Sequence, residues 1–382
     1  SVYKHANCYI CSPNHTFVTD KDGNQMLDEG GNPMYYDGYC FSATIAGNGL
    51  GGILSYGSLE MYPTTAELKP VSAHLLWESD FGLITQVELL FGYVRFKVPD
   101  RSKEGNAVIA VYDSKGVVLW SWHIWITDPP QEQVFVGDGG NEIVMLDRNL
   151  GATSDKWITG DSDSALETYG LYYQWGRKDP SMGPQTYDYI PITLVTAPYW
   201  DYSSRERRAA EVVQVPRPTL EDGVKHPMFL ILPSEQTETY IYNWTYKSYD
   251  FLWGYLPDEG TMTKTIYDPC PFGYRVPLSE MDTIFAADEH SKFFTPSADE
   301  YGQKFTNNGN TFYFPYAGYK GVDVGLQSLV MAWNYVGEKG DYMSAAVSKN
   351  TNNKYNHRSR VYISRSNSWT ETNVGSYHAY RT

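Results

Sequence analysis

Residues 106–126 carry the pattern that most restricts how this chain can fold. Two apolar runs, residues 107–112 and 117–126, flank the tetrapeptide Asp113-Ser-Lys-Gly116. This arrangement predicts a β-hairpin in which Gly116 takes the positive φ that the turn requires. The second run is apolar on both faces, which is typical of a strand in the middle of a sandwich. Further short strands are predicted before the hairpin, at residues 73–77, 84–89 and 93–98.

Composition supports the same fold class. The chain of 382 residues is 15% aromatic, with 33 Tyr, 15 Phe and 11 Trp, and it also contains 33 Gly and 21 Pro. Aromatic residues favour strands, and Gly and Pro favour the tight turns between them. Because this length exceeds what one small core can bury, we expect a mainly β protein of two domains. We place a β-sandwich domain at residues 1–130, ending at Thr127-Asp-Pro-Pro130, and a second domain at residues 131–382.

The charge and the apolar runs exclude two classes of partner. The formal net charge is −15, and no basic stripe offsets it, so a nucleic acid would be repelled. The longest apolar run, residues 117–126, is too short to span a bilayer, and we predict no transmembrane helix. The sequence begins Ser1-Val-Tyr-Lys, without Met or a signal peptide, and we expect a mature or trimmed product.

The four cysteines give no metal site. Cys8 and Cys11 form a C-x-x-C pair, but no second pair and no His cluster follows at the spacing of a zinc site. The segment around them reads as a strand that enters a turn, which does not suit a redox motif at the start of a helix. We therefore expect buried thiols or one structural disulfide, for which Cys8 and Cys40 are the candidates.

One short segment resembles the start of a calcium loop. Asp20, Asp22 and Asn24 place oxygen-bearing side chains at alternate positions. The glycine comes at the fourth position instead of the sixth, and Gly31 occupies the place of the bidentate Glu. A hairpin turn also explains these residues. Calcium is thus the one cofactor that the sequence leaves open.

Three blocks in the second half carry a resemblance to a known family. They resemble the C-terminal domain of fimbrillin-type surface proteins from Bacteroides-like bacteria, a domain related to the Fibrobacter succinogenes major paralogous domain. The first half is similar to the same proteins through three shorter segments. The second-half blocks are residues 147–153, 169–180 and 268–277, and the first-half segments are residues 6–10, 72–77 and 120–125.

The resemblance implies a fold and a location. It implies a C-type-lectin-like α+β domain at residues 131–382. The sequence fits this fold through one predicted helix over residues 278–287, for which Ser279 is the candidate N-cap. It also implies an extracellular protein on the bacterial surface, associated with the outer membrane and with pili or adhesion. Its partners would be other fimbrial subunits or host surface glycans and proteins. Family members often end in an Arg-Cys that this sequence lacks, which would leave Cys270 unpaired.

The sequence gives little support for catalysis. It has eight His, none in a His-Glu-x-x-His spacing, and no Gly-x-Ser-x-Gly elbow. The tripeptides with which true C-type lectins bind calcium and sugar are not found either. We predict a non-enzymatic adhesin, or a tip or accessory subunit of a fimbrium. A surface protein that captures glycans as nutrients is the alternative, and a carbohydrate-active enzyme is a third.

Aromatic residues between positions 198 and 255 are the candidate ligand-binding residues. Tyr199, Trp200, Trp244 and Tyr246 lie in a stretch with a weak secondary-structure pattern, interleaved with Asp, Asn, Ser and Lys. Aromatic faces stack on sugars, and neighbouring polar groups bind the sugar hydroxyls. The alternative is that these residues pack long loops together. We expect Trp244 and Tyr246 to be the exposed members.

Each of the three second-half blocks contains an arginine. We expect these arginines to form buried or half-buried ion pairs that hold irregular loops. The expected pairs are Arg148 with Asp147, Arg177 with Asp179, and Arg275 with Asp268.

Overall fold

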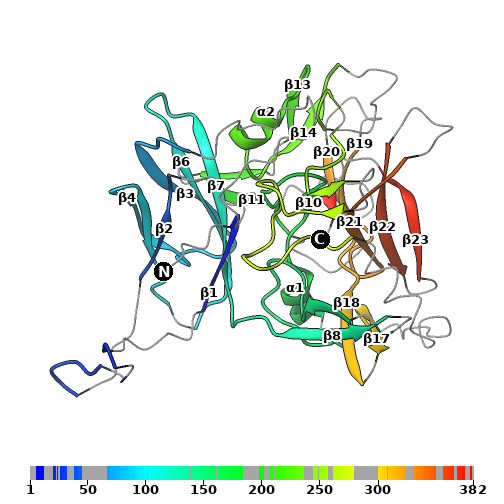
Figure 1. The fold of residues 1–382 in the computed structure, drawn as a ribbon, viewed down its shortest axis with the longest axis horizontal. Coiled ribbons are helices and arrows are strands. Elements are labelled where there is room, and N and C mark those ends of the chain that lie inside the picture. The colour runs from blue at the N-terminus through cyan, green and yellow to red at the C-terminus, as the bar shows by residue number, and fades with distance from the viewer. Residues whose placement is uncertain are drawn as a thin grey trace.

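The computed structural model shows a mainly β protein (Figure 1). Strands dominate, and the two helices among the described residues are short. No helix in the described part of the chain has the length and apolar character needed to cross a bilayer. The structure describes all residues except 1–5, 13–19, 23, 25, 32–37, 45–66, 101, 138–139, 141, 161, 184–197, 202–205, 210–211, 236–243, 248, 257–260, 279–299, 308, 324–329, 350–355, 365–367, 375–378 and 381–382.

The first part of the chain forms two sheets, on the left in Figure 1. They are joined by aromatic contacts, because the ring of Phe41 lies 4.8 Å from that of Trp122 and 4.6 Å from that of Tyr9. One sheet has the order β1 (Cys8–Cys11), β7 (Val118–Ile126), β6 (Gly105–Tyr112) and β3 (Ser72–Glu78), and the other has the order β2 (Gly38–Ser42), β5 (Tyr93–Lys97) and β4 (Thr85–Leu90).

The rest of the chain is divided among small sheets and two helices. The larger sheets are β10 (Tyr173–Gln174), β24 (Ala379–Tyr380), β19 (Tyr319–Asp323) and β20 (Val330–Asn334), and β21 (Lys339–Lys349), β22 (Asn356–Ser364) and β23 (Ser368–Val374). The paired strands are β8 (Glu132–Val136) with β9 (Glu142–Leu146), β11 (Pro198–Asp201) with β12 (Glu206–Ala209), β13 (Val212–Val215) with β14 (Leu230–Pro233), β15 (Tyr255–Leu256) with β16 (Thr261–Met262), and β17 (Gly302–Asn307) with β18 (Asn310–Pro315). The helices are α1 (Ser162–Tyr169) and α2 (Leu220–Lys225).

The hairpin predicted at residues 106–126 is present as β6 and β7. Asp113 Oδ1 accepts hydrogen bonds from the amides of Lys115 and Val117, each at 2.8 Å, and Gly116 has a φ of 77°. Glycine adopts this left-handed conformation without steric cost. The strands predicted before the hairpin are present as β3, β4 and β5, and the segment around Cys8 and Cys11 forms β1. The helix predicted over residues 278–287 lies almost wholly outside the described residues.

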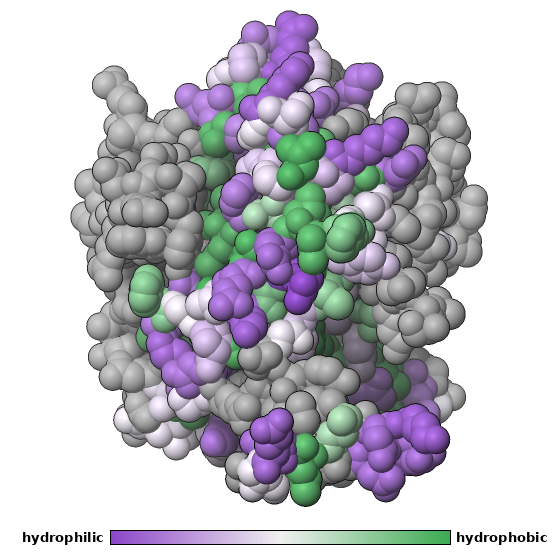
Figure 2. All heavy atoms as spheres, turned by 90° about the vertical axis from the view of Figure 1, so that its left-hand side faces the viewer, coloured by the Kyte–Doolittle hydropathy of each residue, from purple (hydrophilic) through white to green (hydrophobic). Residues whose placement is uncertain are grey.

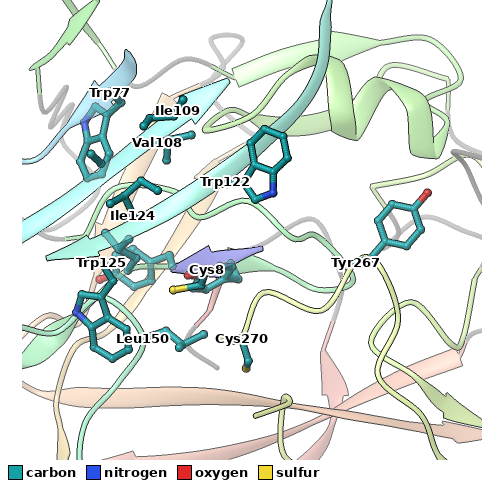
Figure 3. Close-up of a cluster of buried hydrophobic side chains, with 14 of the residues drawn as sticks. Cys8, Trp77, Val108, Ile109, Trp122, Ile124, Trp125, Leu150, Tyr267 and Cys270 are labelled. Atoms are coloured by element: carbon teal, nitrogen blue, oxygen red, sulfur yellow. The ribbon is translucent and has the colours of Figure 1, made fainter. Parts of the chain in front are cut away.

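One hydrophobic core runs through both halves of the chain. Trp77, Trp122 and Ile124 from the first sheets belong to the same buried cluster as Leu150 and Tyr267 from the second half (Figure 3). Helix α2 also packs against β7. A smaller, mostly aromatic cluster is formed by β8, β9, β17, β18, β21 and β22, and its members are Phe135, Ile143, Phe305, Phe312, Phe314, Tyr316, Tyr342 and Ile363.

Buried hydrogen bonds also join the halves. Asn7 Nδ2 donates to the carbonyl oxygens of Ile266 and Asp268, at 2.6 and 2.8 Å. Asn106 Nδ2 donates to Gly151 O at 2.8 Å, and Trp125 Nε1 donates to Ala152 O at 2.9 Å. Buried amide and indole groups cost free energy unless they are bonded, so these contacts fix how the second half lies on β7.

An ion pair is buried at the same junction. Lys178 Nζ lies 2.7 Å from Asp179 Oδ1, and each of the two side chains is 2% exposed. Lys178 Nζ also donates to the Oγ of Ser121 on β7 at 2.7 Å, and Ser121 Oγ donates to Asp179 Oδ1 at 2.6 Å. The lysine lies over the ring of Trp120, 4.4 Å from its centroid. Although it joins a serine, a lysine and a carboxylate, this group is closed to substrates by its burial.

The predicted disulfide between Cys8 and Cys40 is not formed, and the cysteines are free. Cys8 lies on β1, which pairs with β7, whereas Cys40 lies on β2 in the other sheet and is exposed. Cys8 and Cys270 belong to the buried cluster in Figure 3. Burial raises the pKa of the Cys8, Cys11 and Cys270 thiols well above the usual range. The alternative of buried thiols therefore describes these three residues, which are unreactive packing groups.

The end of the molecule formed by the N-terminal strands shows apolar side chains among polar ones (Figure 2). Phe81 and Phe91, in the turns on either side of β4, are 73% and 93% exposed.

Candidate ligand-binding site

The structure places Trp244 in the core and not on the surface. Its side chain is 3% exposed, and its Nε1 donates to Trp175 O at 2.8 Å. The guanidinium carbon of Arg177 lies 5.6 Å from the centre of its ring. The expectation that Trp244 is exposed is therefore wrong, because the indole packs against α2 and against the turn that follows β10 instead of facing solvent.

Tyr246 is half-buried, and another side chain covers its ring. Arg217 lies over the ring at 5.1 Å and is held there by an ion pair with Glu235 at 2.6 Å. A sugar that stacked on this side of the ring would have to displace the arginine. Tyr199 and Trp200 lie on β11, paired with Arg208 and Arg207 of β12, and their side chains lie outside the described residues.

Asp20, Asp22 and Asn24 form a hydrogen-bonded turn. Asp20 Oδ1 accepts from the amides of Asp22 and Asn24, each at 2.9 Å, and Asp20 Oδ2 accepts from Asn24 Nδ2 at 3.1 Å. The turn thus accounts for the side chains of Asp20 and Asn24. No cluster of three or more His, Cys, Asp or Glu is arranged to hold a metal ion among the described residues. Calcium binding here stays a prediction.

Of the three expected arginine ion pairs, the structure forms the one between Arg148 and Asp147. Arg148 Nε lies 2.8 Å from Asp147 Oδ1, and both side chains are nearly buried. The expectation for Arg177 is wrong, because its guanidinium donates to Gln174 Oε1 and to the carbonyl oxygens of Phe229, Gly223 and His226. Asp179 is paired with Lys178 instead.

The third expected pair is also wrong. Asp268 is bonded to Lys264 Nζ at 2.9 Å and is completely buried, whereas Arg275 is exposed and donates to Val276 O at 3.1 Å. Arg275 therefore lies where a ligand can reach it.

A pocket of about 340 Å³ lies beside β9, at the second aromatic cluster. This volume falls within the range of ligand pockets, which begins at roughly 300 Å³. We call it the motif pocket, because two of the three second-half blocks supply much of its lining. It is lined by Glu142, Ile143, Val144, Met145, Leu146, Asp147, Arg148, Asn149, Leu150, Cys270, Gly273, Tyr274, Arg275, Pro277, Phe312, Tyr313, Phe314 and Tyr342.

Strand β9 offers main-chain groups to a ligand of the motif pocket. Val144 is opposite Val134 of β8 in the antiparallel register, and Val134 O accepts from Asn310 Nδ2 at 2.9 Å on the far side of β8. Since the N–H and C=O of one residue in an antiparallel strand point the same way, those of Val134 and Val144 point away from each other. Among the described residues, no group is bonded to the N–H or C=O of Val144. Its side chain is 49% exposed.

A tyrosine and an arginine lie beside these main-chain groups. Tyr274 OH donates to Glu132 Oε1 at 2.7 Å. Partial burial, and to a smaller extent this hydrogen bond, raises the pKa of Tyr274 to about 12. The phenol therefore keeps its proton at physiological pH. Arg275 adds a charged fork of N–H donors. The combination of an aromatic floor with a few polar groups is typical of ligand sites.

Residues 268–277, which we call the wall segment, are held in place by Asp268. Its Oδ1 accepts from the amide of Cys270 at 2.8 Å, and its Oδ2 accepts from the amide of Val276 at 3.0 Å. Both oxygens of one buried carboxylate thus fix both ends of the turn that carries Tyr274 and Arg275.

The sequence marks the segments of this site but does not show that they lie together. Arg148 and Arg275 were singled out, but as structural residues. The two blocks that supply much of the lining lie more than a hundred residues apart in the sequence, and no local pattern shows that they meet. The shared signal was the pair of blocks at residues 147–153 and 268–277. A comparison with protein-family models, with curated proteins and with solved structures finds no match to this chain.

Proposed function

We propose that this protein is a non-enzymatic adhesin of the bacterial surface, or a tip or accessory subunit of a fimbrium. It binds a surface glycan or protein at the motif pocket. The observation that carries the proposal is the convergence of two resemblance-bearing blocks on one pocket that has an aromatic floor, open main-chain groups and an exposed arginine. In this proposal the first two sheets form a β-sandwich that carries the second half, a C-type-lectin-like α+β unit.

The buried cluster at the junction supports a binding role over a catalytic one. Ser121, Lys178 and Asp179 lie within hydrogen-bond distance of one another, but their exposed fractions are 4% or less. A substrate cannot reach them without separating β7 from the second half. The polar groups that line the motif pocket are binding groups, and the ion pair of Arg148 with Asp147 is satisfied within the chain.

Binding of the full chain to arrays of glycans, mucins and fimbrial proteins tests the proposal. We expect Val144→Lys, which places a charged side chain at the motif pocket, to reduce binding at least tenfold. Val71→Lys is the matched control, since Val71 is 61% exposed and does not line the pocket. Binding that survives Val144→Lys but is lost in Tyr246→Ala would move the site to the aromatic loop. No binding to any surface ligand would contradict the proposal.

A further inference from the structure

The ammonium group of Lys264 lies at the centre of a ring of oxygen atoms. Its Nζ is 2.9 Å from Asp268 Oδ1, 2.9 Å from Cys270 O, 3.3 Å from Pro271 O and 2.6 Å from Tyr274 O. An ammonium group has three N–H donors, so four acceptors at these distances share them. All four oxygens belong to the wall segment, and the lysine lies outside it.

This arrangement has the chemistry of a cation site. One carboxylate supplies the negative charge, and three backbone carbonyls supply the remaining ligands, as carbonyl oxygens do where proteins bind potassium. The Asp268 side chain is 0% exposed and that of Lys264 is 12% exposed. A buried carboxylate without a neighbouring cation would be strongly unfavourable. Without a positive charge at this point, the three carbonyl dipoles and the carboxylate would also repel one another.

We propose that Lys264 is the positioning residue of the motif pocket, and that its ammonium group fills a site for a monovalent cation at the inner side of the wall segment. The lysine holds Cys270 and Tyr274, both of which line the pocket, through their carbonyl oxygens. When the ammonium group is removed, a potassium or ammonium ion from solution takes its place. This inference does not depend on what the pocket binds.

Thermal unfolding of the full-length Lys264→Met variant tests the proposal. Methionine keeps the apolar stem and removes the charged end. At constant ionic strength in choline chloride, we expect the Tm of this variant to fall by several degrees below that of the wild type. Replacing choline with potassium or ammonium should restore at least half of the lost Tm, and the recovery should saturate as the site fills.

Lys103→Met is the matched control. Lys103 Nζ also contacts one carboxylate, Asp80 at 3.0 Å, and one carbonyl, Phe81 O at 3.1 Å, but it lies on the surface. Its Tm should be the same in potassium and in choline. If Lys264→Met is recovered only in an unfolded form, Lys264→Gln, which keeps a donor for the carbonyls, is titrated in the same way. Equal Tm values in potassium and choline for the Lys264 variant, or the same potassium recovery in the Lys103 variant, would overturn the proposal.

Discussion

The indole of Trp244 is closely packed on all the elements that it contacts, and it is 3% exposed. A Cβ added to Gly223 of α2 would lie 2.8 Å from the indole, and Arg177 donates hydrogen bonds to the carbonyl oxygens of Gly223 and of the C-cap residue His226. Truncation of a buried tryptophan leaves a cavity, so Trp244→Ala should lower the free energy of unfolding by about 3–5 kcal/mol. Tyr246→Ala should cost about 1 kcal/mol or less, because Tyr246 is half-buried. Equilibrium unfolding in urea measures both losses, and equal losses would contradict the assignment of Trp244 to the core.

The buried ring of His123 lowers the free energy of unfolding in acid. Its ring is buried, its Nε2 contacts Asn106 Oδ1 at 2.8 Å, and burial lowers its pKa to about 3. In the unfolded chain a histidine keeps a pKa of roughly 6.5. Between these values only the unfolded chain binds the proton, so stability is lost as the pH falls from 6.5 towards 3. The slope from this group is about 1.4 kcal/mol per pH unit.

Replacement of His123 by Gln tests that slope. The amide keeps a partner for Asn106 and does not titrate. Urea unfolding at a series of pH values should show a shallower acid dependence for His123→Gln than for the wild type. His74→Gln, on the exposed face of β3, is the control and should keep the slope of the wild type. An unchanged slope in His123→Gln would show that other groups cause the acid loss.

At the scale of elements, two glycines with the same backbone conformation differ in their surroundings. Gly116 in the turn between β6 and β7 has a φ of 77°, and an added Cβ would meet nothing within 4 Å. Gly170, after α1, has a φ of 66°, and an added Cβ would lie 2.4 Å from Leu150 O. Alanine at Gly116 therefore carries only the cost of the left-handed conformation, about 1 kcal/mol. Alanine at Gly170 must also move the backbone of Leu150, at the base of the motif pocket.

Urea unfolding of Gly116→Ala and Gly170→Ala measures this difference. We expect the Gly170 variant to lose at least twice as much free energy of unfolding as the Gly116 variant. Because Leu150 lines the motif pocket, the Gly170 variant should also bind surface ligands more weakly. Similar losses in the two variants would mean that the chain around Leu150 moves without cost.

Elements with regular patterns could be predicted from the sequence. β6 and β7 have apolar runs bounded by a turn with Asp113 and Gly116, and β8 and β9 have the same arrangement around a glycine-rich turn. The helices α1 and α2 were not foreseen, since each is short and has few apolar residues to mark its period. The burial of Trp244 was not foreseen either. A tryptophan in a loop has no alternating neighbours that would show which way it faces.

Contacts between distant segments could not be predicted, and they decide the form of the whole molecule. The apolar run of β7 indicated a strand that is buried on both faces, but not that the second half of the chain covers one of them. The core that runs across residue 130 follows from such contacts. The pairing of Asp268 is a different case, because its partner Lys264 lies only four residues earlier in the chain. The charges of Lys264 and Arg275 are the same, and the sequence does not show which of these two neighbours the carboxylate binds.

The ion pair of Lys178 with Asp179 tests how strongly the two halves depend on each other. Lys178→Met would leave the carboxylate of Asp179 buried without a cation, so we expect a loss of about 3–5 kcal/mol in the free energy of unfolding. The double variant Lys178→Met/Asp179→Asn removes both charges and should lose much less than the single variant. Lys225→Met, which breaks the partly exposed pair with Glu221, should lose about 1 kcal/mol or less.

Urea unfolding of the three variants at pH 7 measures these losses. A loss in the double variant as large as the loss in Lys178→Met would mean that the unpaired charge of Asp179 is not what destabilises the single variant, and that the buried pair does not hold the two halves together.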